Sequence, residues 1–281
     1  MFQINWKLKS LLYNIFGFFK LKKTVYLTQK YVTKRSKINI DSINKIWKFH
    51  SDAIESNDIK HLLEVGAGKS LEQNIYLSYF FKNKIHQTAI DIDKMLDFEL
   101  LNEASLQISK VLKLKFPGKI DNLNNLSSTY NIEYIAPQST KDLIKKDSKF
   151  DICLSSTALE HFTKKDLGTY LKEVKKLIKK FGLISSVIDY SDHYSHTDST
   201  ISPLNFLKFN DKQWERHNNL FLYQNRFRHK DYVNLFKEFQ YEIVQEVKGE
   251  IMDPPDKLDS SFQISNKDNF ILWGYFLVKN L

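Results

Sequence analysis

Five short apolar runs, separated by polar and helical segments, constrain the fold of this chain more than any other feature. They lie at 61–66, 87–91, 132–136, 150–156 and 182–189. A further apolar run, "FILWGYFLVKN" at 270–280, is expected to form a final, largely buried strand. The clearest helical pattern between them spans 163–180, where Thr163 and Asp166 have the spacing of a capping box and Gly182 follows the end. Alternating strands and helices predict an α/β fold, a parallel sheet covered on both faces, with ligands at the carboxyl ends of its strands.

Length and composition indicate a folded protein. The 281 residues suffice for one large α/β domain with an appendage, or for two small domains. Cys153 is the single cysteine, which excludes an intramolecular disulfide and a cysteine-cluster metal site and favours a reducing, cytoplasmic location. Because it lies inside the run 150–156, we expect it to be a core thiol.

The positive charge is concentrated in one segment. The net charge is +9, yet residues 1–50 hold eleven Lys/Arg and one acid, Asp41, or +10. The remainder has 42 − 11 = 31 bases against 33 − 1 = 32 acids, or −1. We therefore divide the chain into a basic extension, 1–50, and a domain, 51–281, and a nucleic-acid groove across that domain is not expected.

Apolar residues in the extension recur at helical spacing between flanking lysines: Leu8, Leu11, Leu12, Ile15, Phe16 and Phe19. Asn14 and Gly17 interrupt the stretch, which falls short of the roughly 20 residues that span a bilayer. Two interpretations stay open. Residues 1–25 lie on the inner face of a membrane, or the helix packs on its own domain or on a second subunit of a homo-oligomer.

A glycine motif follows the first apolar run, in "HLLEVGAGKS" at 61–70. A dinucleotide site would need Gly-x-Gly-x-x-Gly, but only Gly66 and Gly68 are present and Leu71 fills the third position. Glu64, two residues before the turn, disfavours a pyrophosphate and suits a cationic sulfonium such as that of S-adenosyl-L-methionine. Asp91 ends the next run, 23 residues after Gly68, where an acid bonds ribose hydroxyls.

The glycine motif, Asp91 and "FDICLSSTALEHF" at 150–162 together resemble the class I S-adenosylmethionine-dependent methyltransferases over about residues 58–190. The resemblance implies a Rossmann-like seven-stranded sheet with helices on both faces and S-adenosyl-L-methionine as cofactor. The segment 136–139 is expected beside the adenine, with Pro137 fixing the exit loop, although it could be a simple strand end. The full set of expected cofactor-binding residues is Glu64, Gly66, Ala67, Gly68, Asp91, Ile92, Ala136, Pro137 and Ser155.

More narrowly, the stretches at 134–137, 188–198, 205–209 and 223–228 look like a bacterial subgroup associated with surface-polysaccharide biosynthesis. That resemblance favours O-methylation of a small-molecule or glycan acceptor. Two alternatives remain: an RNA methyltransferase that uses the basic extension as an arm, or a non-enzymatic membrane-associated protein that retains the fold. Nucleic acid is the less favoured partner.

No metal is expected. Related ubiquinone-pathway O-methyltransferases bind one through a glutamate three positions before the Glu-His pair, where this chain has Thr157. One group of acidic residues and histidines further along the chain could in principle bind a metal, but its spacing matches no strong metal motif. That group comprises Asp192, His193, His196 and Asp198.

Transfer to a hydroxyl requires removal of its proton, so histidines near the strand ends are candidate bases. His161, after the fourth run, is the first candidate, and His193, after the fifth, is the second. Asp192 or Asp189 could orient an imidazole there. The competing interpretation is that His161 caps or packs the start of the following helix.

The segment 190–229 is a long insertion, rich in aromatic residues and arginines, at the active end of the predicted sheet. It is expected to form a lid over the acceptor, although the same composition suits a small hydrophobic subdomain or a dimer surface. Arg226 and Arg228 alternate, which predicts one face of a strand. The residues expected to contact the acceptor are Glu160, Tyr194, Arg226 and Arg228.

Overall fold

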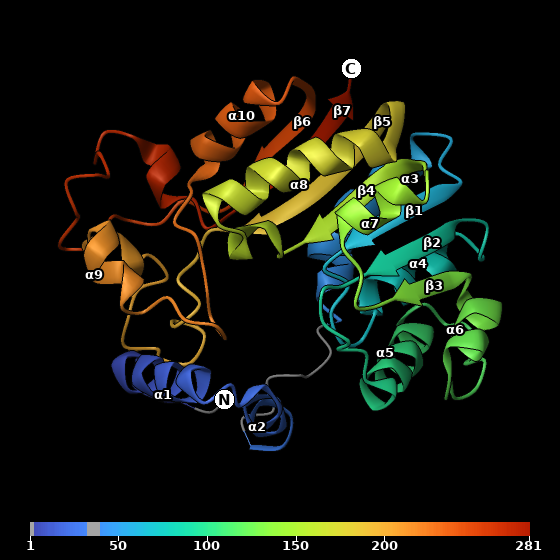
Figure 1. Cartoon of the computed structure of the whole chain (residues 1–281), viewed down its shortest axis with the longest axis horizontal. Coiled ribbons are helices and arrows are strands. Elements are labelled where there is room, and N and C mark those ends of the chain that lie inside the picture. Colours follow the sequence, from blue (N-terminus) through green and yellow to red (C-terminus); the bar gives the residue numbers. More distant parts are fainter. Residues whose placement is uncertain (1–2, 33–39) are drawn as a thin grey trace.

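A computed structural model describes residues 3–32 and 40–281 and has a seven-stranded sheet in the order β3-β2-β1-β4-β5-β7-β6 (Figure 1). Strands β1 to β5 pair in parallel, and β7 runs antiparallel to both β5 and β6. This is the predicted Rossmann-like architecture of seven strands, and its order reverses between β1 and β4. The strands are His61–Val65, His86–Ile90, Ile132–Ile135, Phe150–Ser156, Ile178–Asp189, Tyr241–Lys248 and Trp273–Asn280.

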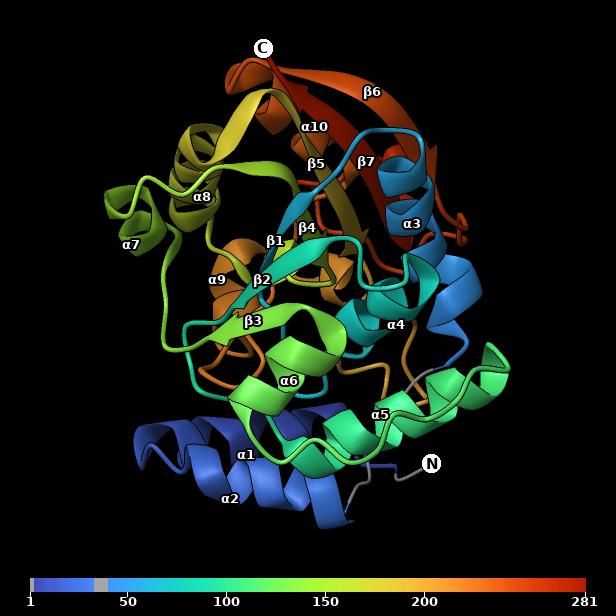
Figure 2. The ribbon, with the colours of Figure 1, turned by 90° about the vertical axis from the view of Figure 1, so that its right-hand side faces the viewer.

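Helices cover both faces of the sheet (Figure 2). Side chains alternate between faces along each strand, so neighbouring residues of β4 enter different cores: Ile152 packs on one side and Cys153 on the other. Burial raises the pKa of the Cys153 thiol to about 12, as expected for a core cysteine. The first core lies under α3 (Lys48–Glu55), α4 (Glu72–Phe80), α5 (Phe98–Val111) and α6 (Leu123–Tyr130), the second under α7 (Thr140–Lys145), α8 (Lys164–Leu177) and α10 (His229–Glu238).

Helix α8 begins as predicted but ends early. The Asp166 N–H donates to Thr163 Oγ1 at 3.1 Å, which confirms the N-cap. The helix stops at Leu177, and β5 begins at the next residue. Gly182 is therefore a strand residue and not a helix terminator. A Cβ there would lie 2.9 Å from the Lys179 carbonyl oxygen, so glycine is required by close backbone packing.

Strand β6 was not predicted. Most of its residues are exposed or half-buried, because it forms an edge of the sheet. Its sequence, "YEIVQEVK", lacks the continuous apolar run that marks the buried parallel strands.

The N-terminal extension forms α1 (Trp6–Phe18), α2 (Lys22–Leu27) and two π-helical turns, Thr28–Val32 and Ile43–Trp47. Ile43 and Trp47 are buried in the first core, so the packed domain begins before residue 50. Within residues 3–32 and 40–281, no helix combines the length and apolar character needed to cross a lipid bilayer. Three basic residues counted in the extension lie outside the described residues: Lys34, Arg35 and Lys37.

The insertion 190–229 contains a short 3-10 helix, Asn205–Lys208, and α9 (Asp211–Glu215). It has a hydrophobic cluster of its own, the third core, to which Trp6 of α1 and Phe270 also contribute. The segment around 226–228 is irregular and Arg228 is the N-cap residue of α10, so the predicted strand there is wrong. The alternation of two arginines arises from loop packing and not from a pleat.

Candidate functional site

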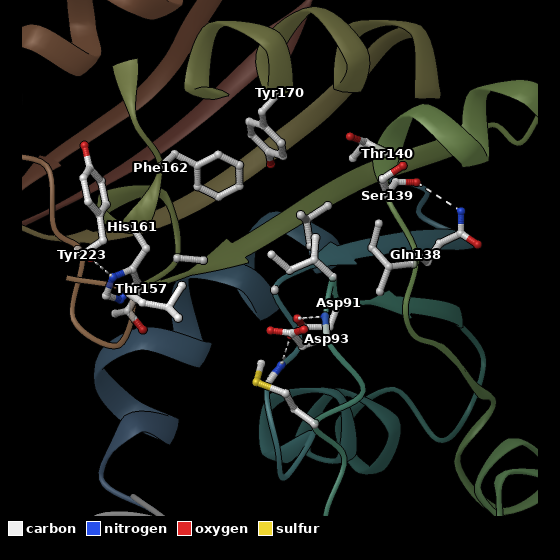
Figure 3. A pocket seen from close by; sticks show the side chains of 18 of the residues that line it. Asp91, Asp93, Gln138, Ser139, Thr140, Thr157, His161, Phe162, Tyr170 and Tyr223 are labelled. Carbon is white, nitrogen blue, oxygen red and sulfur yellow. Dashed lines mark hydrogen bonds between the residues drawn. The ribbon is translucent and has the colours of Figure 1, made fainter. Parts of the chain in front are cut away.

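A cavity of about 500 Å³ opens at the carboxyl ends of β1, β2 and β4 (Figure 3). Five of the predicted site residues line it: Gly66, Gly68, Asp91, Ile92 and His161. The other lining residues are Val65, Ile90, Asp93, Met95, Gln138, Ser139, Thr140, Thr157, Ala158, Phe162, Tyr170, Leu220, Phe221 and Tyr223.

The glycine turn after β1 requires its glycines. Gly66 and Gly68 have φ values of 82° and 73°, in the left-handed region that other residues rarely adopt. A Cβ on Gly66 would also lie 3.1 Å from the Ala158 side chain. Leu71, at the missing third glycine position, is itself left-handed at φ 49° and packs in the first core. The turn therefore brings bare backbone to the cavity, whereas Leu71 anchors the start of α4.

Asp91 lies directly after β2 and faces the cavity. Its two carboxylate oxygens accept hydrogen bonds from the N–H groups of Gly68 and Asp93, each at 3.2 Å. Burial raises the pKa of Asp91, and the backbone N–H groups of Asp93, Gly68 and Ile92 oppose that rise. The carboxylate is thus held at the edge of the glycine turn, where it can bond ribose hydroxyls. Asp93 also lines the cavity.

Glu64 does not line the cavity. Successive strand residues face opposite sides, so Val65 lines the cavity while Glu64 points toward α4. Gln73 Nε2 donates to Glu64 Oε1 at 3.1 Å, and Oε2 is buried without a hydrogen-bond partner. Burial raises the pKa of Glu64 to about 8. Its proposed contact with a sulfonium remains a prediction, and Asp91 is the carboxylate of the pair that faces the cavity.

Four other predicted cofactor residues lie just behind the lining. Ser155 is fully buried on β4 and its hydroxyl has no hydrogen-bond partner. Ala67 sits within the turn, and its N–H donates to the Ile90 carbonyl at 3.2 Å. The chain leaves β3 at Ile135, so Gln138 to Thr140, rather than Ala136 and Pro137, reach the cavity.

His161 occupies the opposite wall of the cavity, in the 3-10 turn Leu159–His161. Its Nδ1 lies 2.7 Å from the Tyr223 carbonyl oxygen, which can only accept, so Nδ1 carries the proton and Nε2 keeps a lone pair. Burial and the nearby His193 lower the pKa of His161. The lowered pKa favours the neutral imidazole. Thr163 caps α8, so His161 does not serve as the cap.

His193 stands beside His161, with their ring centroids 5.1 Å apart. Its Nε2 lies 3.3 Å from Asp189 Oδ2. Burial favours a higher pKa for Asp189, but the adjacent His193 imidazole and hydrogen bonds from Ser191 hold that pKa below its usual value. Asp189 is thus the partner of His193. Asp192 instead accepts hydrogen bonds from the Tyr194 N–H at 2.9 Å and Asn205 Nδ2 at 3.0 Å, and it holds the insertion in place.

Glu160 completes this group. Its side chain is 1% exposed and neither carboxylate oxygen has a hydrogen-bond partner. Burial and the neighbouring Asp189 raise its pKa. Ligand atoms of Glu160, His161 and His193 lie within 4.8 Å of one another. These three side chains could therefore hold a divalent cation. We name the group of Glu160, His161, Asp189 and His193 the strand-end cluster.

None of the three acceptor residues predicted in the insertion lines the cavity, and each bonds a backbone carbonyl. Tyr194 is buried and its hydroxyl donates to the His217 carbonyl at 2.7 Å. Arg228 is buried and Nη1 donates to the Tyr190 carbonyl at 2.7 Å. Arg226 binds the carbonyl of Phe206. These polar groups satisfy backbone carbonyls that folding of the insertion would otherwise bury unpaired.

The insertion reaches the cavity through other residues. Leu220, Phe221 and Tyr223 line it, and Phe162 and Tyr170 form the adjoining wall. The aromatic composition of 190–229 signalled this part of the site, but it did not distinguish the lining residues from those of the third core. That distinction depends on which way each loop residue turns.

Comparison with solved structures finds S-adenosylmethionine-dependent methyltransferases. One from Methanosarcina mazei is 16% identical, with a TM-score of 0.47 over 87% of this chain and 99% of that chain. The 1,6-didemethyltoxoflavin N1-methyltransferase of Burkholderia thailandensis, with S-adenosylhomocysteine bound, is 12% identical, with a TM-score of 0.49 over 93% and 88%.

The N-methyltransferase NodS of Bradyrhizobium japonicum, also with S-adenosylhomocysteine, is 10% identical, with a TM-score of 0.44 over 88% of this chain and 90% of that chain. No protein-family model and no curated protein matches the chain. Its function therefore has to follow from its own residues.

Proposed function

We propose that this protein is an S-adenosyl-L-methionine-dependent methyltransferase that O-methylates a sugar or glycan intermediate in the cytoplasm. One observation carries the proposal: a neutral histidine with an available lone pair faces a glycine turn and a ribose-type carboxylate across one cavity. Asp91 and the turn at Gly66 and Gly68 suit a nucleoside, and His161 suits an acceptor that must lose a proton.

The cofactor would be held by backbone and carboxylate groups. Asp91 would bond the ribose hydroxyls, the turn at Gly66 and Gly68 would let the ligand approach the main chain, and Gln138 to Thr140 would border the adenine. When bound, S-adenosyl-L-methionine supplies a methyl group already activated by its sulfonium. The protein then has to position the acceptor oxygen and to exclude water.

His161 would take the proton of the acceptor hydroxyl. As the acceptor oxygen takes the methyl group, the hydroxyl proton would move to His161 Nε2, and the sulfonium would supply the leaving group, a neutral thioether. His193, held by Asp189, is the second candidate base and lies next to it. The buried Glu160 would accept a hydrogen bond from the acceptor or, in its protonated form, donate one.

We propose that the transfer needs no metal, because the neutral His161 is sufficient to accept the proton. Activity should then persist in EDTA after removal of bound metal by chelation. A loss of activity in EDTA that a divalent cation restores would contradict this and would assign Glu160, His161 and His193 as ligands.

The direct test has two steps. Calorimetry should show binding of S-adenosylhomocysteine and no tight binding of NADH. A scan of glycan intermediates, with RNA as a comparison acceptor, should then find a cofactor-dependent mass gain of one methyl group that the His161→Ala variant lacks. Tight NADH binding without S-adenosylhomocysteine binding would overturn the proposal. Methylation of RNA and of no glycan would show that RNA is the acceptor.

The N-terminal extension would hold this enzyme at a membrane that carries its acceptor. The basic, amphipathic character of residues 1–25 supports this placement.

A further inference from the structure

Helix α1 divides its residues between two faces. One face points into the protein at helical spacing: Trp6 belongs to the third core, Ser10 Oγ lies 2.9 Å from His217 Nδ1, and the ring of Tyr13 is 6.0 Å from that of Phe221. A Cβ on Gly17 would lie 3.7 Å from Leu220. Aromatic and polar residues therefore attach α1 to the insertion, and the apolar stripe does not.

Four of the six predicted stripe residues are exposed, whereas Leu12 and Phe16 are half-buried. Leu8, Leu11, Ile15 and Phe18 follow the same helical spacing and are all exposed, with Phe18 82% exposed and the following Phe19 63%. Among the described residues, eight of twenty exposed large apolar side chains lie between residues 8 and 31. We name these eight the N-terminal apolar surface: Leu8, Leu11, Ile15, Phe18, Phe19, Leu21, Leu27 and Tyr31. A patch of this density indicates a surface that contacts something apolar.

The positive charge around this surface indicates which kind of apolar partner it can bind. Lys7, Lys20, Lys22 and Lys23 are exposed on α1, α2 and the turn between them. The sequence contains no Asp or Glu before Asp41. A second copy of the chain would bring the same positive charge against it. An anionic lipid surface offers both an apolar interior and the opposite charge.

Helices α1 and α2 lie below the sheet in Figure 1, and two of their contacts reach residues of the cavity lining. Gly17 adjoins Leu220 of the insertion on one side, and Lys22 Nζ lies 3.0 Å from Asp93 Oδ2 on the other. Both of those neighbours line the cavity. Two lining residues are themselves exposed and apolar, Leu220 at 58% and Ile92 at 76%. The apolar character of the surface thus extends to the cavity mouth.

We propose that the N-terminal apolar surface binds an anionic membrane and turns the cavity mouth toward the lipid headgroups. The acceptor class that fits this orientation is a glycan carried on a lipid, because its head would reach the strand-end cluster while its chain stays in the bilayer. The acceptor part of this inference rests on the proposed methyl transfer. The membrane contact does not.

The first experiment floats the full-length protein with phosphatidylcholine vesicles, with and without phosphatidylglycerol. The protein should float with the anionic vesicles and detach as salt is raised. The double variant Phe18→Asp/Phe19→Asp should bind them roughly tenfold or more weakly. The matched control is Phe181→Asp, an exposed phenylalanine (61%) at the start of β5, which should float like the parent protein.

Three results would overturn the surface. In the first, the parent protein stays in solution with anionic vesicles; in the second, the double variant floats as the parent does. In the third, sedimentation shows a dimer that the Phe18→Asp/Phe19→Asp substitutions dissociate, which would assign the surface to a second copy. S-adenosylhomocysteine binding separates this inference from the proposed function. Binding without flotation contradicts only the surface, and flotation without binding contradicts only the methyl transfer.

A second measurement addresses the acceptor. With the same glycan head on a lipid in anionic vesicles and as a soluble glycoside, the parent enzyme should show a KM roughly tenfold lower for the lipid form. The double variant should lose that advantage and keep its kcat on the soluble form. Equal KM values for both forms in the parent enzyme would overturn the lipid-linked acceptor.

Discussion

The two walls of the cavity differ in how they are built. The wall formed by the ends of β1 and β2 consists of a glycine turn and a carboxylate that follow their strands directly. The opposite wall combines the turn at 157–162 with parts of the insertion that lie more than fifty residues further along the chain. Local sequence therefore specifies the first wall, whereas the second depends on how distant segments pack.

Substitution of His161, on the second wall, should have the largest effect on kcat. The His161→Ala variant should lose about 10²–10⁴-fold in kcat, since a general base contributes that much, while its affinity for S-adenosylhomocysteine stays unchanged. Steady-state kinetics and calorimetry check the two halves. If the variant retains kcat, His161 is not the general base.

The pH profile distinguishes a base from a structural histidine. Burial lowers the pKa of His161, so the neutral form is present above that pKa and is lost as pH falls through it. kcat/KM of the parent enzyme should therefore fall about tenfold per pH unit at the acid end. The residual activity of His161→Ala should lack this inflection. An inflection that persists in the variant would assign the titration to another group.

Arg228 tests whether the insertion residues are structural. Arg228→Ala would leave the carbonyls of Tyr190 and Ile271 buried without a donor and should cost about 3 kcal/mol, lowering Tm by roughly 5–10 °C. The exposed Arg216→Ala is the matched control and should leave Tm unchanged. Thermal unfolding measures both. An unchanged Tm with a raised KM for the acceptor would restore Arg228 as an acceptor contact.

Asp91 should affect the other wall alone. Asp91→Ala removes a carboxylate that would bond ribose hydroxyls and should weaken S-adenosylhomocysteine binding by about 10–100-fold. Titration calorimetry gives the Kd. The neighbouring Asp93→Ala, which also lines the cavity, is the control and should change Kd much less. If Asp93→Ala has the larger effect, the ribose carboxylate has been assigned to the wrong residue.

Glu64 should give the smallest change. Burial raises its pKa to about 8 and its side chain faces α4, so Glu64→Gln should alter the Kd for S-adenosylmethionine by less than about threefold. A parent affinity that rises with pH through this range, and a variant that lacks the rise, would show that Glu64 ionises toward the sulfonium. That result would restore the electrostatic preference read from the sequence.

The sequence predicted six of the seven strands, because buried strands read as continuous apolar runs. It also predicted that helices cover both faces of the sheet. It missed β6, whose edge position leaves it polar, and it extended α8 past Leu177 because apolar Ile178 continues the helical spacing into β5. Gly66, Gly68, Asp91 and His161, which the sequence singled out, line the cavity, and their roles there stay predictions. The sequence could not distinguish Arg228 and Asp192 from residues that face the cavity. Both side chains form hydrogen bonds with buried backbone or amide groups instead.

What the sequence determined by itself is local: glycines where the backbone is left-handed, an acid at a strand end, and a helical stripe of apolar residues in the extension. The tertiary structure decided which way side chains face. It turned Glu64 behind the glycine turn, paired His193 with Asp189 and left most of the apolar stripe of α1 exposed. Strand and helix periodicity assigns residues to a common face, but only the packing of distant segments decides what each face meets.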